Sequence, residues 1–281
     1  MKLGYLTQLT EGECKLAAQI GYDCLEVHGK WQPDAIRTAS ACRAEADRAK
    51  AMLQENGLAI SAIALYNAGP VDVKKAVARY TAYIKMCCEL GVDVITTMSA
   101  GDPRLGLDEN LKVFAAVFRK VAPRAEGAGV RIAFENWPGL TGTFPPFGSI
   151  NVGFTPQVWE RMFNEVKSES LGLEFDPSHL VWQGIDWAGV LRRFAPKVYH
   201  VHAKDTEVLT DRLSANGFFS GGWWRYRLPG YGCVDWHKLT SILKEHGYEG
   251  GICVEHEDPV FSGPRRQEGL RKAHAFLRPL V

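Results

Sequence analysis

The residues Ile84-Lys-Met-Cys-Cys-Glu-Leu-Gly91-Val-Asp-Val-Ile-Thr-Thr97 pass from a helical pattern into a β-rich one at a single glycine. Before Gly91, apolar side chains recur every three or four residues from Val73 onward, which predicts the buried face of a helix. After Gly91, the segment Val92–Thr97 is short and rich in β-branched residues, which predicts a strand. Glycine commonly caps a helix in the left-handed conformation, so these residues predict a helix followed directly by a strand.

The same junction recurs along the chain. A glycine followed by an apolar residue ends a helical pattern at Gly21, Gly57, Gly91, Gly129 and Gly247. The first four of these glycines are separated by 36, 34 and 38 residues. A period of that length accommodates one strand, one helix and two loops, so the repeat indicates a series of βα units.

Eight short apolar segments are the predicted strands, and they lack clean alternation with polar residues. They are Lys2–Leu6, Cys24–His28, Ala59–Leu65, Val92–Thr97, Val130–Glu135, Leu171–Asp176, Val198–His202 and Gly251–Glu255. Such strands are typical of parallel sheets covered by helices. Eight βα units in 281 residues predict an α/β fold, a single (β/α)8 TIM barrel spanning residues 1–281. The main alternative is an open doubly wound sheet, but no Gly-x-Gly-x-x-Gly follows the first strand.

Three residues mark expected helix boundaries. Thr10 followed by Glu13 predicts a capping box, and Asp235 predicts the cap of a later helix. Pro123 lies late in another helical pattern and predicts that this helix kinks or ends there.

Two connections after predicted strands are long, namely Trp137–Thr155 after the fifth strand and about 206–234 after the seventh. Both lie at the C-terminal face of a barrel, where barrel enzymes carry out their chemistry. The second connection carries the aromatic residues Phe218, Phe219, Trp223, Trp224 and Tyr226. Exposing these side chains together would be unfavourable, so we expect both loops to shape a substrate pocket.

Composition and charge narrow the expected partners. The chain has 33 Lys and Arg against 32 Asp and Glu, so it lacks the excess of basic residues typical of a nucleic-acid-binding protein. Its seven cysteines are odd in number and without C-x-x-C spacing, which favours reduced thiols. No apolar run is long enough for a signal peptide or a membrane span. We therefore expect a cytoplasmic protein with no nucleic-acid or membrane partner.

Candidate metal ligands end the last four predicted strands. They are Glu135, Asp176, His202 and Glu255. The C-terminal ends of barrel strands converge on one mouth, where three carboxylates would repel one another without a cation. A set of carboxylates and one imidazole suits Mn²⁺, Co²⁺, Mg²⁺ or Zn²⁺, so we predict one divalent metal ion in preference to a structural cluster.

The histidines near this mouth have different expected places. His200 and His202 lie two residues apart on one face of a strand, so His202 is the predicted ligand and His200 lies deeper in the barrel. His179 follows its strand and is expected to bind substrate or to transfer a proton. His256 is expected on the outward face, against the helices.

The ordered motifs resemble those of the xylose-isomerase-like barrels. The residues that carry the resemblance are Glu135-Asn136, Asp176-x-x-His179, His200-x-His202-x-Lys204-Asp205 and Glu255. This superfamily includes sugar-phosphate isomerases and epimerases, ketose 3-epimerases, inosose dehydratases and endonuclease IV-type enzymes. The resemblance covers nearly the whole chain and implies a homo-oligomer that binds a small-molecule sugar.

The resemblance to ketose 3-epimerases also implies roles for individual residues. Glu135, Asp176, His202 and Glu255 are implied to bind one divalent ion, most often Mn²⁺, and the two glutamates are implied to form an acid/base pair. Residues His179 and Arg227, the latter within Arg227-Leu-Pro-Gly230, are implied to contact substrate oxygens. The motifs Lys204-Asp205 and His256-Glu257-Asp258 are closer to inosose dehydratases and to barrels that process 3-keto-glycosides.

These residue types suit proton abstraction from a carbon beside a carbonyl group. The resulting enediolate is stabilised by a metal ion, and Glu135 and Glu255 could exchange the proton on opposite faces of the sugar, which gives epimerisation or isomerisation. The same enediolate could instead expel a β-substituent, with His179 or Lys204 protonating the leaving oxygen. The tryptophan-rich loop favours a larger, glycosidic substrate.

Further residues are expected near the substrate. Trp224 and Trp137 are predicted pocket walls, and Asn136 and Asn67 are predicted to bond sugar hydroxyls. His28, with Glu26 before it, ends the second strand and either touches substrate or has a structural role.

Two other functions fit less well. An endonuclease IV-type enzyme needs additional histidines, but the third and fourth strands end near Leu65-Tyr66-Asn67 and Thr96-Thr97-Met98. A non-catalytic sugar-binding subunit would be expected to have lost a ligand, and none of the four is missing.

Overall fold

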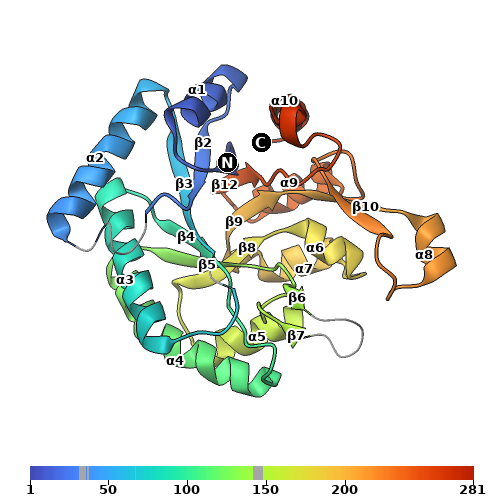
Figure 1. The fold of residues 1–281 in the computed structure, drawn as a ribbon, viewed down its shortest axis with the longest axis horizontal. Coiled ribbons are helices and arrows are strands. Elements are labelled where there is room, and N and C mark those ends of the chain that lie inside the picture. Colours follow the sequence, from blue (N-terminus) through green and yellow to red (C-terminus); the bar gives the residue numbers. More distant parts are fainter. Residues whose placement is uncertain (32–35, 37, 67, 142–147) are drawn as a thin grey trace.

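Eight parallel strands close into a barrel (Figure 1), as the sequence predicts. The computed structural model describes residues 1–31, 36, 38–66, 68–141 and 148–281. In order around the barrel the strands are β1 Lys2–Thr7, β12 Gly251–Val254, β9 Val198–Ala203, β8 Leu171–Phe175, β5 Arg131–Glu135, β4 Val94–Thr97, β3 Ala59–Leu65 and β2 Cys24–His28. Strand β1 pairs with both β2 and β12, which closes the barrel. The α/β barrel prediction is confirmed.

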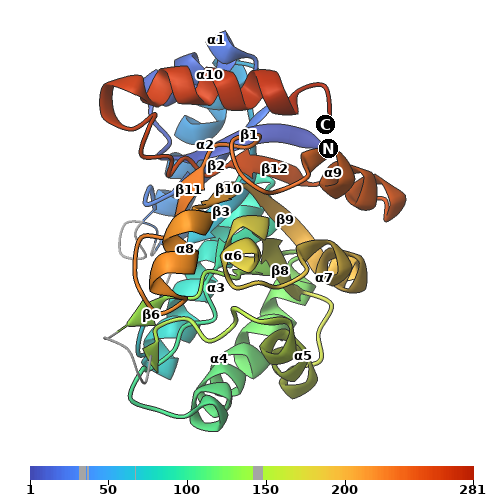
Figure 2. The same cartoon turned by 90° about the vertical axis from the view of Figure 1, so that its right-hand side faces the viewer.

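Helices surround the barrel in both ribbon views (Figures 1 and 2). They are α1 Glu11–Ile20, α2 Ala39–Glu55, α3 Val73–Leu90, α4 Leu107–Gly127, α5 Pro156–Glu165, α6 Pro177–Trp182, α7 Trp187–Phe194, α8 Thr210–Asn216, α9 Trp236–Glu245 and α10 Arg266–Leu277, with short 3-10 turns at Ala195–Lys197 and Gly263–Arg265. The five junction glycines all have positive φ, between 66° and 101°, which confirms the predicted repeat.

Local capping agrees with the sequence in most places. The hydroxyl of Thr10 accepts a hydrogen bond from the amide of Glu13 at 3.2 Å, and Asp235 caps α9. The Glu13 carboxylate, however, pairs with Arg266 instead of completing the capping box. The expectation that this helix ends at Pro123 is wrong, because α4 continues to Gly127, whereas a kink there stays a prediction. A proline removes one backbone hydrogen bond, but burial of the neighbouring Val121, Ala122 and Ala125 keeps this helix against the barrel.

Alternate residues of the barrel strands face different environments. Side chains such as Leu3, Phe134 and Phe175 belong to the apolar core between strands and helices. Strand alternation directs Glu174 and His200 to the other side, into the barrel, and both are completely buried. The barrel interior therefore holds charged groups that need partners.

The two long connections contain small sheets. In the first, β6 Leu140–Thr141 pairs with β7 Gly148–Ser149. In the second, β10 Asp205–Val208 pairs with β11 Trp224–Arg227, and α8, which connects them in the chain, lies at one side of the barrel (Figure 1). The expectation that all five aromatic residues of this loop are covered is wrong for Phe218 and Phe219, which are 58% and 68% exposed. Trp223 is buried, and its ring packs edge-on against Phe218.

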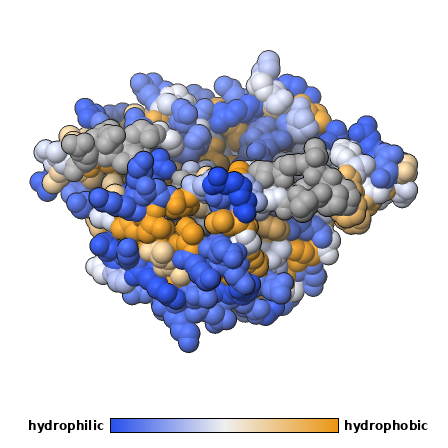
Figure 3. All heavy atoms as spheres, turned by 60° about the horizontal axis from the view of Figure 1, so that its bottom comes forward, coloured by the Kyte–Doolittle hydropathy of each residue, from blue (hydrophilic) through white to orange (hydrophobic). Residues whose placement is uncertain are grey.

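The outer surface is mainly hydrophilic on the face shown in Figure 3, with local apolar areas between polar side chains. Within the described part of the chain, every helix is too short or too polar to span a bilayer.

Candidate functional site

The four predicted metal ligands meet at the C-terminal end of the barrel. Glu135 ends β5, His202 lies near the end of β9, and Asp176 and Glu255 directly follow β8 and β12. One ligand atom from each of the four lies within 4.8 Å of the others. Glu135, Asp176 and His202 are buried, and the Glu255 side chain is 16% exposed. The structure thus brings together residues that are 120 positions apart in the chain, from 135 to 255.

Several buried atoms at this point lack a hydrogen bond. They are Oδ2 of Asp176, Nδ1 of His202 and Nε2 of His179. Nδ1 of His202 lies 3.1 Å from Oε2 of Glu255 and 3.3 Å from Oε1 of Glu135. A buried polar atom without a partner costs about 1–3 kcal/mol, and a bound cation would supply that partner for the Asp176 oxygen and the His202 nitrogen. Three carboxylates and one imidazole nitrogen therefore fit a divalent ion such as Mn²⁺, Co²⁺, Mg²⁺ or Zn²⁺.

Asn136 holds Asp176 in place from behind. Its side-chain oxygen accepts the amide of Asp176 and its side-chain nitrogen donates to the Asp176 carbonyl, both at 2.8 Å. Oδ1 of Asp176 then accepts the amide of Ser178 and caps α6, which leaves Oδ2 for a ligand. Asn136 is completely buried and supports the backbone of Asp176, and a sugar contact for it stays a prediction.

Lys204 contributes a buried cation beside this donor set. Its ammonium pairs with Glu255, lies 3.1 Å from Asp176 and 3.0 Å from Glu257, and is 1% exposed. Burial lowers the pKa of Lys204, but the Asp176 and Glu255 charges outweigh burial and raise this pKa well above its ordinary value. Burial likewise raises the pKa of Glu255, but Lys204 and His202 hold this pKa well below its ordinary value. The sequence indicates Lys204 as a proton donor without revealing this charge pairing.

Glu135 is also held in its ionised form. Burial and the Glu255 charge raise its pKa, but the His179 and His202 rings, at 3.5 and 3.3 Å from the carboxylate, outweigh them and lower the pKa to about 2. Both predicted acid/base glutamates are therefore carboxylates at neutral pH, as metal ligands need to be.

Tyr226 of β11 reaches His179 from the long loop. Its hydroxyl lies 2.9 Å from Nδ1 of His179, and its ring lies against the Lys204 ammonium, 4.5 Å from ring centre to Nζ. Burial raises the pKa of Tyr226, so its hydroxyl keeps its proton and can donate to Nδ1. Nε2 of His179 then carries the ring proton and lies 3.3 Å from Asp176 and 3.5 Å from Glu135. The sequence placed Tyr226 in an aromatic loop but gave no sign of this contact.

The remaining predicted substrate residues lie around the same loop or at strand ends. Trp224 stacks on Trp182 of α6, with ring centres 4.7 Å apart. The Arg227 guanidinium is held by Asp258 at 2.9 Å and Glu207 at 2.6 Å, so it fixes β11 to the loop after β12. A substrate contact for Arg227 stays a prediction.

Three other residues are expected to contact substrate. His28 and Trp137 are partly exposed, at the end of β2 and just after β5, and their substrate contacts also stay predictions. Asn67 lies outside the described residues.

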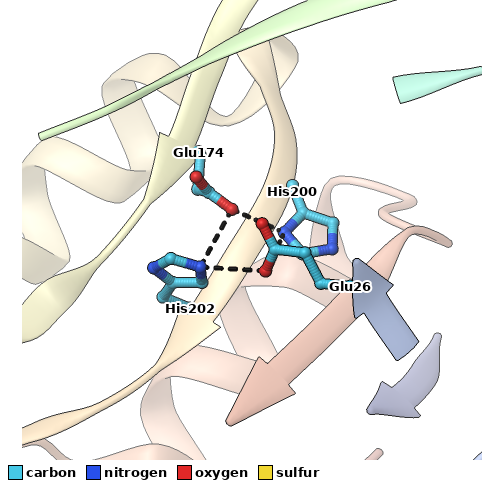
Figure 4. A group of neighbouring side chains, drawn as sticks. All are labelled: Glu26, Glu174, His200 and His202. Atoms are coloured by element: carbon cyan, nitrogen blue, oxygen red, sulfur yellow. Dashed lines mark hydrogen bonds and ion pairs between the residues drawn. The ribbon is translucent and has the colours of Figure 1, made fainter. Parts of the chain in front are cut away.

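A second cluster lies deeper in the barrel, on the other side of the His202 ring (Figure 4). It consists of Glu26, Glu174, His200 and His202. The deeper place predicted for His200 is confirmed, whereas Glu174 was missed. The signal for Glu174 is strand alternation, since it precedes Asp176 by two residues as His200 precedes His202.

His256 has the outward position expected of it. Its ring packs closely against Gly269 of α10, where an added side chain would collide with Nε2. It therefore lies apart from the metal-ligand set, between the barrel and a covering helix.

Comparisons with known proteins agree with this geometry. A family model described as xylose isomerase-like TIM barrel matches residues 14–280. The chain is 26% identical to the uncharacterised protein YfiH of Bacillus subtilis, over 100% of this chain and 99% of that protein. It is 30% identical to an inosose dehydratase of Clostridium beijerinckii, over 61% of this chain and 55% of that protein. The matched region thus spans a little over half the length of that dehydratase.

Solved structures share the fold over the whole chain. A structure of IolI protein with a bound zinc atom superposes with a TM-score of 0.72 at 22% identity, covering 100% of this chain and 98% of that one. A D-psicose 3-epimerase in the presence of D-fructose gives a TM-score of 0.70 at 15% identity, covering 100% and 99%. At these identities the likeness shows the fold alone. With its closed barrel and the match to the family model, the chain belongs to the xylose isomerase-like TIM barrel family.

Proposed function

We propose that this protein is a divalent-metal-dependent sugar isomerase or epimerase that acts on a keto sugar through an enediolate. The observation that carries the proposal is the placement of Glu135 and Glu255. Both carboxylates lie beside Nδ1 of His202, at 3.3 and 3.1 Å, but they come from β5 and β12, which are three positions apart around the barrel. They therefore approach one point from different sides, as exchange of a proton between two faces of a sugar requires.

The metal would be held by Glu135, Asp176, His202 and Glu255, a set rich in oxygen that suits Mn²⁺. Bound there, a divalent cation supplies Lewis-acid stabilisation of the negative charge on the enediolate oxygens. The ring Nε2–H of His179, oriented by Tyr226, donates a hydrogen bond to a substrate oxygen. One glutamate removes the proton from the carbon beside the carbonyl group, and the other returns a proton to the opposite face.

The protonating glutamate needs a proton source, because both carboxylates are ionised. Lys204 is hydrogen-bonded to Glu255 and holds it as a carboxylate, so Glu255 is suited to remove the substrate proton, and Glu135 would return a proton after taking one up from water. Lys204 also donates to Glu257, whose side chain is 47% exposed.

Elimination from the same enediolate is the second candidate, and one observation favours it. Two proton donors, Lys204 and His179, lie on the side of the site next to Tyr226, where a leaving oxygen could be protonated. The similarity to inosose dehydratases agrees with a lyase acting on a 3-keto-glycoside, an inosose or a related keto sugar.

Incubation of a 3-keto-glucoside with the enzyme and Mn²⁺ in D₂O separates the two reactions. Isomerisation or epimerisation predicts deuterium at the carbon beside the carbonyl group and no released aglycone. Elimination predicts free aglycone or an unsaturated sugar. Metal-loaded enzyme that catalyses neither exchange nor release on a panel of keto sugars and inososes would contradict the proposed enediolate chemistry.

A further inference from the structure

The second cluster lies on the barrel axis beneath the metal-ligand set. Glu26 of β2 and Glu174 of β8 come from strands on opposite sides of the closed barrel, four positions apart in the strand order. Both carboxylates reach Nε2 of His202, Glu26 at 2.9 Å and Glu174 at 3.1 Å (Figure 4). His200 supports Glu174 from the side, with Nδ1 at 2.9 Å from the carboxylate. All four side chains are completely buried.

The separations in this cluster could also suit a second metal ion, but its hydrogen bonding does not. Glu26 accepts from Tyr66 at 3.1 Å and from Thr96 at 2.6 Å, in addition to His202. Nε2 of His200 has Ser61 at 3.1 Å. None of the unpartnered buried atoms found in the described part of the chain belongs to Glu26, Glu174 or His200. The cluster is therefore a completed network, unlike the donor set above it.

The network has a direct consequence for the metal ligand. Two carboxylates lie 2.9 and 3.1 Å from Nε2 of His202, and an N–H at this nitrogen can donate to both, so these contacts favour the ring proton on Nε2 when the other nitrogen binds a cation. Nδ1 is the nitrogen that faces Glu135, Asp176 and Glu255, so it is the one directed at a cation bound among these carboxylates. Contacts from two strands also prevent the imidazole ring from rotating. Such outer partners of a metal-binding histidine typically alter metal affinity by about 10- to 100-fold when they are changed.

We infer that Glu26 and Glu174 are positioning residues of the metal centre, which hold His202 in the Nε2–H tautomer with Nδ1 directed at the cation. The inference rests on the proposed function in one respect, namely that His202 is a ligand of a divalent ion. It goes beyond that function because it assigns two buried glutamates outside the ligand set to control of metal affinity.

The test is a Co²⁺ titration of chelator-treated protein against a competing chromogenic chelator. Glu26→Gln and Glu174→Gln should each weaken Co²⁺ binding about 10- to 100-fold while keeping one ion per chain. Ser61→Ala is the control, since it removes a partner of His200 but touches neither Glu26 nor Nε2 of His202, and it should change the affinity by no more than about twofold.

A further variant separates the inference from the proposed function. His202→Gln should abolish tight Co²⁺ binding. If it does so while both glutamine variants bind Co²⁺ like the wild type, the positioning role is overturned and the metal site stands. If His202→Gln itself binds normally, the metal site fails. Two Co²⁺ ions per wild-type chain would also overturn the inference, because the cluster would then be a second metal site.

A measurement on the wild-type protein tests the inference even if the variants do not fold. In the zinc-loaded protein, long-range ¹H–¹⁵N correlation spectra report which nitrogen of His202 carries the proton. The inference predicts a proton on Nε2 and a metal-shifted, unprotonated Nδ1. A proton on Nδ1 would overturn it.

Discussion

The two sides of the His202 ring differ in how completely their polar atoms are satisfied. On the Nε2 side, the carboxylates of Glu26 and Glu174 and the Tyr66 hydroxyl lie within 3.1 Å of the nitrogen. On the Nδ1 side, the nitrogen makes no hydrogen bond, although carboxylates surround it. Both sides are clusters of buried acids around one imidazole. On the Nε2 side every polar atom of the described residues has a partner, and we call it the complete side. On the Nδ1 side polar atoms lack a partner, and we call it the incomplete side.

This difference distinguishes residues that hold His202 in place from the proposed ligands of a metal ion. A buried network that is fully hydrogen-bonded stabilises one arrangement of side chains, whereas a buried set with unpartnered atoms is a site for something else. An acidic cluster alone would not make this distinction, because both sides contain carboxylates and share His202.

The largest expected effect concerns the carboxylates that contact Lys204. Glu255→Gln removes an acid/base group and a metal ligand, so kcat should fall by about 10³-fold or more at saturating metal, with substrate binding largely kept. Glu257→Gln is the matched control, since Glu257 also pairs with Lys204 but lies outside the donor set. Steady-state kinetics of both variants should show a loss under tenfold for the control. A fully active Glu255→Gln would remove Glu255 from the mechanism.

Metal removal should lower the Tm only through loss of the ion bound on the incomplete side. A ligand present at 100 times its dissociation constant stabilises a protein by about 2.7 kcal/mol, which for a chain of this size is about 5–10 °C in Tm. Chelator treatment should therefore lower Tm by that amount, and added Mn²⁺ should restore it. In His202→Gln the Tm should not respond to either treatment. An unchanged Tm in the wild type would argue against metal binding by these residues.

Asn136 tests whether the support of Asp176 matters for metal binding. Asn136→Ala leaves the buried backbone groups of Asp176 without partners, which should lower the free energy of unfolding by about 1–3 kcal/mol and weaken Mn²⁺ binding. Asn110→Ala is the control, because Asn110 bonds to the backbone of Asp102 in a loop that contributes no metal ligand. Chemical unfolding should show similar losses in both variants, with Mn²⁺ affinity reduced only in the first. Equal affinities would leave Asn136 with a purely structural role.

The two sides also differ in their expected response to pH in the metal-free protein. On the complete side, burial raises the pKa of Glu174 to about 7 from its ordinary 4.5, so the folded chain binds a proton that the unfolded chain has released, and this group lowers stability as pH rises from 4.5 to 7. On the incomplete side, the pKa of Glu135 is lowered to about 2, so its contribution is present above pH 4.5 and is lost as pH falls toward 2.

Urea unfolding of the metal-free protein at pH 5 and pH 7 measures the first of these effects. The Glu174→Gln variant cannot titrate at this position, so its loss of stability between the two pH values should be smaller than that of the wild type. Equal losses in both proteins would show that Glu174 does not take up the proton.

The smallest effect is expected at Tyr226. Tyr226→Phe removes the hydroxyl that orients His179 but keeps the ring against Lys204, so kcat should fall by about tenfold with little change in KM. Tyr231→Phe, in the loop beside Arg227, is the control and should leave both constants unchanged. A change confined to KM would indicate that Tyr226 serves substrate binding only.

The sequence predicted the incomplete side better than the complete one. Glu135, Asp176, His202 and Glu255 lie at or directly beside the C-terminal ends of strands, and barrel topology brings strand ends together whatever the details of packing. Contacts across the barrel, such as Glu26 with His202, depend on strand order and side-chain reach, which local patterns do not contain. The pairing of Lys204 with Glu255 and of Arg227 with Asp258 depends on loop geometry in the same way.

Anomalous diffraction from a crystal soaked in Mn²⁺ tests the central claim most directly. The account predicts one peak per chain, within coordination distance of Nδ1 of His202 and of the Glu135, Asp176 and Glu255 carboxylates. A peak on the Nε2 side, between Glu26 and Glu174, or no peak at either place, would contradict it.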